Sequence, residues 1–63
     1  MTKERVQKEL DRMTEGKYSA FTVGQLADQV DWLWKWRKIT HEEMEMMCLQ
    51  VIHIIGMGVY EVQ

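Results

Sequence analysis

The chain has no proline, one cysteine, four glycines and no hydrophobic run long enough to cross a membrane. Without proline, a helix can run unbroken. A single cysteine, Cys48, excludes a disulfide within the chain. A membrane-spanning helix needs about 20 apolar residues, so we expect no membrane segment. With no recognisable signal peptide, we expect a reduced, cytoplasmic protein.

The chain also has little excess of one sign of charge over the other. The formal net charge is −2, from 8 basic and 10 acidic residues, which provides no broad positive field to attract nucleic acid or anionic lipid. Hydrophobic residues make up 46% of the chain and charged residues 29%, as in an ordinary globular domain. The 63 residues are enough for one domain, so we expect residues 1–63 to form a single helical domain.

Start and stop signals predict an all-α, three-helix unit with a short extended C-terminal tail. The predicted helices span about residues 3–14, 22–38 and 41–55. Thr22–Gln25 and Thr40–Glu43 both fit the capping box, in which the threonine oxygen accepts a backbone N–H and the residue three positions later reaches back. Gly16 is expected to stop the first helix. The fold class is therefore predicted from helix signals alone.

The second predicted helix has a core face and a separate aromatic flank. Its core face consists of Val23, Leu26, Ala27, Val30, Leu33 and Trp34. Tyr18 and Phe21, which precede this helix, are expected to fold inward over the core. Trp32 and Trp36 lie on a flank about 100° away, one turn apart. Two interpretations stay open: other parts of the chain cover these tryptophans, or the tryptophans anchor an interface, where this residue type is enriched.

Residues 44–55 are apolar around almost the whole circumference of the third predicted helix. One predicted stripe contains Met44, Met47, Cys48, Val51 and Ile55, and the other side carries Met46, Leu49, Ile52 and Met57. A helix that is apolar all round normally sits inside a large protein or a membrane. This chain provides neither, so we expect a homo-oligomer, most simply a homodimer. The predicted interface residues are Trp32, Trp36, Met46, Leu49, Val51, Ile52 and Ile55.

These features favour a protein–protein interaction or oligomerisation module with a protein partner. The competing interpretation is a small helix-turn-helix-like regulator that binds nucleic acid through Lys35, Arg37 and Lys38. Thr22–Ala27 resembles the opening of such motifs in bacterial regulators. The motif then requires a short turn, whereas this chain continues from Asp28 without a helix breaker. Nucleic acid is therefore the less favoured partner.

The sequence shows no catalytic or metal-binding pattern. His41, Glu45 and Cys48 share one side of the third predicted helix, but structural zinc sites usually show cysteine pairs at short spacing. Nucleophilic catalysis needs a nucleophile, a base and an orienting group within reach of each other. Ser19, Cys48 and the histidines match no such signature. We therefore expect no enzyme, no metal site and no cofactor.

Residues 26–47 carry a local likeness to known proteins. They combine Leu26-x3-Val30-x2-Leu33 spacing with the segment Lys38-Ile-Thr-His-Glu-Glu-Met44. This pattern resembles short helical hairpins near the C-termini of bacterial proteins and small phage tail-region proteins of the XkdX type. Met44 stands where these hairpins usually carry an aromatic residue, and Arg37 where glycine is common. The resemblance implies a docking or oligomerisation hairpin of phage or mobile-element origin, and no activity.

Overall fold

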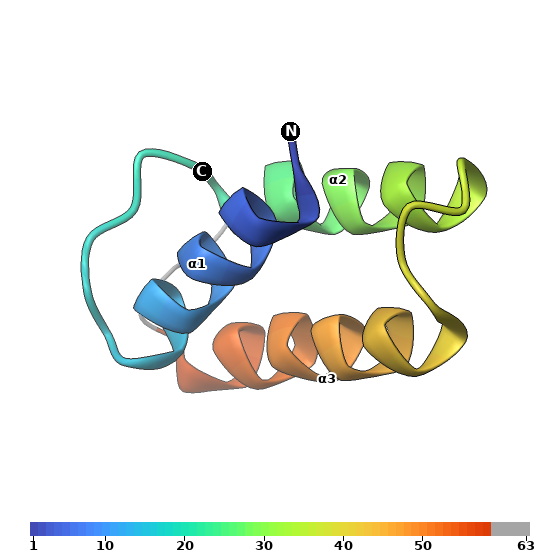
Figure 1. The fold of residues 1–63 in the computed structure, drawn as a ribbon. Helices are drawn as coiled ribbons and strands as arrows, with labels where there is room; N and C mark the ends of the chain where they lie inside the picture. Colours follow the sequence, from blue (N-terminus) through green and yellow to red (C-terminus); the bar gives the residue numbers. More distant parts are fainter. Residues whose placement is uncertain (59–63) are drawn as a thin grey trace.

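A computed structural model of the chain describes residues 1–58. These residues form three helices: α1 (Lys3–Thr14), α2 (Val23–Lys35) and α3 (His41–Met57). Figure 1 shows α2 and α3 running antiparallel, with α1 packed across both. The predicted all-α, three-helix fold is confirmed. The extended tail predicted after the third helix falls on residues 59–63, outside the described residues.

Each helix begins at a threonine cap. The Oγ1 atoms of Thr2, Thr22 and Thr40 accept hydrogen bonds from the backbone N–H three residues later. At Thr22 and Thr40 the reciprocal bond is present too: Gln25 and Glu43 accept from the cap backbone N–H at 2.8 and 2.9 Å. Both predicted capping boxes are therefore confirmed. Because such caps satisfy backbone donors that lack helical partners, they define the first residue of each helix.

Two helices end in the same hydrogen-bonded turn. After α1, Gly16 has φ 79°, and the N–H groups of Gly16 and Lys17 donate to Met13 and Arg12. After α2, Arg37 has φ 55°, and the N–H groups of Arg37 and Lys38 donate to Trp34 and Leu33. Both patterns are Schellman motifs. The predicted extension of the second helix to residue 38 is wrong, because this turn ends it at Lys35.

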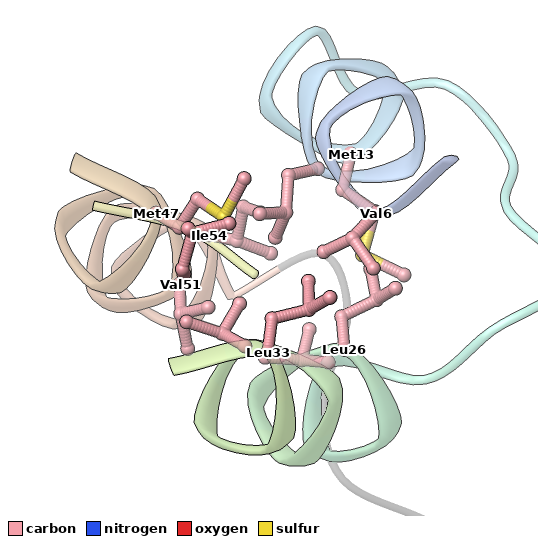
Figure 2. Packing of buried hydrophobic residues seen from close by; sticks show 11 residues of the cluster. Val6, Met13, Leu26, Leu33, Met47, Val51 and Ile54 are labelled. Atoms are coloured by element: carbon pink, nitrogen blue, oxygen red, sulfur yellow. The ribbon is translucent and has the colours of Figure 1, made fainter. Parts of the chain in front are cut away.

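All three helices contribute to one hydrophobic core. Figure 2 shows side chains from each helix meeting between them. The buried hydrophobic residues are Val6, Leu10, Met13, Val23, Leu26, Val30, Leu33, Ile39, Met47, Val51 and Ile54. Phe21 packs against this cluster, as predicted. Tyr18 does not fold inward: it is 79% exposed. Its expected role in the core is therefore wrong.

Polar contacts hold α1 against the rest of the molecule. The buried carboxylate of Glu9 accepts a hydrogen bond from Ser19 Oγ at 2.6 Å and pairs with Arg5 at 3.1 Å. This contact ties the α1–α2 connection back to α1. Lys3 Nζ lies 2.7 Å from Glu43 Oε2 at the start of α3. These contacts connect α1 to segments that follow much later in the sequence.

Candidate interaction surfaces

The outer side of α3 carries four large hydrophobic side chains that are exposed in the structure of residues 1–58. They are Met46, Leu49, Ile52 and Ile55, each between 57% and 64% exposed. We call these four residues the α3 apolar face. With about 100° of rotation per residue, Leu49 and Ile52 lie opposite the buried side of the helix, and Met46 and Ile55 flank them. The exposed Cys48 lies beside this face, and the exposed Gly56 continues its centre line toward the end of the helix.

The buried side of α3 consists of Met47, Val51 and Ile54. Their spacing of four and three residues places them on one stripe that meets α1 and α2. Val51 was predicted at the interface, but it is only 8% exposed and belongs to the core. Ile55, which was grouped in one stripe with Met47 and Val51 and was also predicted at the interface, is exposed, and the adjacent Ile54 takes the buried position. Nearly uniform hydrophobicity around α3 concealed which side faces inward.

Charge is distributed unevenly along α3. Its first five residues include Glu42, Glu43 and Glu45, and the helix contains no lysine or arginine. The carboxylate of Glu45 lies 2.7 Å from His41 Nδ1, one turn earlier. His53 is exposed in the second half of the helix. The α3 apolar face is therefore bordered by carboxylates at its N-terminal end and by no carboxylate from residue 46 to Met57.

Two exposed tryptophans at the C-terminal end of α2, Trp32 in the helix and Trp36 at its cap, form a second surface. The rings of Trp32 and Trp36 are 6.1 Å apart between centroids and tilted by 44°. Trp32 is 45% and Trp36 62% exposed, so the described part of the chain leaves much of this pair open. Trp32 also lines an open groove of about 370 Å³ with Leu33, Lys38 and the first four residues of the chain. We call Trp32 and Trp36 the tryptophan pair.

The tryptophan pair and the α3 apolar face do not join into one surface. Trp32 borders the N-terminal end of α1, whereas Leu49 and Ile52 point away from both α1 and α2. Trp34, predicted in the core, is instead 39% exposed, and its ring meets that of His41 edge to face at 5.4 Å. The sequence therefore grouped interface residues that the fold separates onto two surfaces.

Lys35, Arg37 and Lys38, the residues predicted to bind nucleic acid in the alternative interpretation, lie around the C-terminal end of α2. All are exposed. Lys35 lies 4.0 Å from Asp31, and Lys35 and Arg37 border a hollow beside Trp34. Arg37 and Lys38 follow the helix in the Schellman turn rather than extending it. A recognition helix ending in these three residues is therefore not formed, because only Lys35 belongs to α2.

Two carboxylates have shifted proton affinity. The hydrogen bond from Ser19, followed by the charges of Arg5 and Arg12, lowers the pKa of Glu9. The hydrogen bond from Lys3, followed by that from the Thr40 backbone, lowers the pKa of Glu43. The hydrogen bond to Glu43 and the charge of Glu43 raise the pKa of Lys3. Sequence reasoning did not single out Glu9. A lone glutamate on a helix carries no signal that it will be buried and paired with a distant serine.

The cysteine and histidine side chains of α3 have only local partners in the part of the chain that the structure describes. Among residues 1–58, no group of three or more histidine, cysteine or acidic side chains is placed to hold a metal ion. The Cys48 thiol lies 3.7 Å from the sulfur of Met44, and His41 contacts Glu45. No helix in the described part of the chain is long and apolar enough to span a membrane. Comparisons with protein-family models, curated proteins and solved structures returned no match.

Proposed function

We propose that this protein is a small helical interaction module that self-associates through the α3 apolar face. The observation that carries the proposal is the exposure of four large hydrophobic side chains on one helix. Large contiguous apolar patches are uncommon on monomeric proteins and mark interaction sites. A second copy is the simplest partner, because most soluble oligomers are symmetric homo-oligomers. The resemblance of residues 26–47 to docking hairpins points to the same class of function.

The available surface supports a weak dimer. Completing the burial of one such side chain is worth about 1 kcal/mol, since full burial is worth about 1.5–3 kcal/mol. Two copies contribute eight side chains, on the order of 10 kcal/mol. Association costs about 4–15 kcal/mol in lost freedom of motion. We therefore expect dimerisation to depend on protein concentration.

The tryptophan pair provides a second docking surface in this proposal. Tryptophan brings a large, rigid contact area at small entropic cost and is enriched among interface hot spots. Because the pair lies apart from the α3 apolar face, it remains accessible after self-association. The module would then use α3 to pair with itself and the tryptophan pair to bind another protein.

The replacement Ile52→Asp tests self-association. Ile52 is 64% exposed, so the variant should stay folded while a charge enters the centre of the α3 apolar face. We expect sedimentation velocity to show a concentration-dependent dimer for the unaltered chain and a helical monomer for Ile52→Asp, with dimerisation weakened at least about tenfold. Circular dichroism checks that the helices persist.

Two control variants define the specificity of this test. Ala20→Asp adds the same charge to the exposed α1–α2 connection and should leave the dimer intact. Trp36→Ala removes exposed apolar area from the other surface and should also leave it intact. An unaltered chain that stays monomeric at all concentrations would refute the proposal, as would a dimer that survives Ile52→Asp. Dissociation by Trp36→Ala would instead place the tryptophan pair in the dimer interface.

A further inference from the structure

We infer that two copies of this chain pair antiparallel along α3, with Leu49 of each copy against Ile52 of the other. This inference rests on the proposed self-association and specifies its geometry. It follows from the order of side chains along the outer side of α3 and from the position of the acidic residues at one end of the helix.

The outer side of α3 has the spacing of a helix-pairing seam. Glu45, Leu49, Ile52 and Gly56 are separated by four, three and four residues, and all four are exposed. Spacing that alternates between three and four keeps side chains on one side of a helix and in register with a partner helix. The seam thus has two large apolar residues at its centre, a carboxylate at one end and a glycine at the other.

A parallel pair would match these residues badly. Equivalent positions would meet, so Glu45 would lie against Glu45 of the second copy. Like charges in close contact repel each other. On α3 there is no lysine or arginine, and the partner of Glu45 on this helix is His41, with Nδ1 2.7 Å away. At the other end Gly56 would meet Gly56, and this residue has no side chain to fill the space: an added Cβ would find nothing within 4 Å. Parallel pairing would therefore combine repulsion at one end with a gap at the other.

An antiparallel pair removes both defects. Centring the two-fold axis between Leu49 and Ile52 brings Glu45 of one copy opposite Gly56 of the other. The glutamate methylenes can then lie over the space left by the glycine, and the carboxylate remains at the solvent-exposed end. The acidic ends of the two helices are separated by most of the helix length. On the flanks of the seam, the same arrangement places Cys48 near Ile55 and Met46 near His53.

Disulfide trapping tests the orientation. In a Cys48→Ser background, single-cysteine variants Leu49→Cys and Ile52→Cys are mixed in equal amounts, allowed to equilibrate under reducing conditions and then mildly oxidised. Mass spectrometry measures the three possible cross-linked products. Antiparallel pairing predicts that the mixed 49–52 product exceeds the share expected from random pairing. A predominance of 49–49 and 52–52 products would establish a parallel pair and overturn the inference, leaving self-association intact.

Sedimentation of each reduced variant, and of the Cys48→Ser parent, separates failure of the geometry from failure of the proposed function. If the reduced parent does not dimerise and oxidation yields only random pairing, both proposals fail. The replacement Glu45→Gln gives an independent readout in the chain with native cysteine. In an antiparallel dimer, removal of this charge should change the dissociation constant by less than about threefold, whereas relief of contact between like charges in a parallel dimer should strengthen binding by about fivefold or more.

Discussion

At the scale of single residues, Arg37 occupies a left-handed position in a helix-ending turn where glycine is the usual residue. Gly16 and Arg37 occupy the same position in two Schellman turns, and both have positive φ. For a residue with a Cβ atom, this left-handed conformation costs about 1–2 kcal/mol. The turn nevertheless forms at Arg37, because its two backbone hydrogen bonds and the burial of nearby Ile39 offset that cost. The sequence predicts the helix end at Gly16, because glycine adopts positive φ readily. It does not predict the end at Arg37, because arginine rarely adopts this conformation.

Substitutions at positions 37 and 16 should change the free energy of unfolding in opposite directions. Arg37→Gly should increase the free energy of unfolding by up to about 1 kcal/mol, because relief of strain exceeds the added entropy of the unfolded chain. Gly16→Ala should decrease it by about 1 kcal/mol. Chemical denaturation measures both changes. Marked destabilisation by Arg37→Gly would mean that the arginine side chain stabilises the fold by contacts beyond this turn.

At the scale of helices, α3 has buried hydrophobic residues on its inner side and four exposed ones on its outer side. Ile54 is fully buried and the adjacent Ile55 is 57% exposed. The two residues are chemically identical, so only their positions relative to the core distinguish them. The same reasoning explains why the predicted stripe included Ile55 and left out Ile54: the hydrophobic pattern of α3 has no single preferred side.

This adjacent pair provides a matched test of the two sides of α3. Ile54→Ala should lower the free energy of unfolding by about 2–5 kcal/mol, as expected for a buried isoleucine. Ile55→Ala should lower it by less than about 1 kcal/mol in the monomer and should weaken dimerisation instead. Denaturation in an Ile52→Asp background isolates the monomer, and sedimentation of the single variants reports on the dimer. Equal losses of stability would contradict this assignment of the two sides.

At the scale of the whole molecule, ionised carboxylates join segments that are distant in sequence. Glu9 binds Ser19 and the start of α3 is linked to α1 through Glu43 and Lys3. In the folded protein the pKa of each carboxylate is lowered from 4.5. The unfolded chain therefore binds more protons as the solution becomes acidic, and the stability from these contacts is lost as the pH falls below about 4.5.

The variant Glu9→Gln tests whether the Glu9 carboxylate makes stability depend on pH. The variant should be less stable than the unaltered chain near neutral pH, and it should lose less stability between about pH 6 and about pH 3. Glu4→Gln changes an exposed carboxylate in the first turn of α1 and should retain most of the acid sensitivity. Thermal unfolding at several pH values measures these differences. Identical pH profiles for Glu9→Gln and the unaltered chain would exclude a contribution from the Glu9 carboxylate.

Local signals in the sequence determined the all-α fold class and the start of every helix. Capping at Thr22 and Thr40 depends on residues three positions apart, and the stop at Gly16 depends on one residue's conformational freedom. Such short-range physics can be read before the fold is known. Exposure of Trp32, Trp36 and most of the predicted α3 interface is also found in the structure.

Only the tertiary structure decided which side of α3 is buried, where α2 ends and that the exposed apolar residues form two separate surfaces. The first and the last of these depend on contacts between segments far apart in the chain, whereas α2 ends in a local turn at Arg37, a residue type that rarely adopts the left-handed conformation. Val51 belongs to the core cluster that α1, α2 and α3 share. The buried carboxylate of Glu9 accepts a hydrogen bond from a serine ten residues away. A helix with hydrophobic residues on every side offers several faces of similar hydrophobicity, and the packing of its neighbours selects among them.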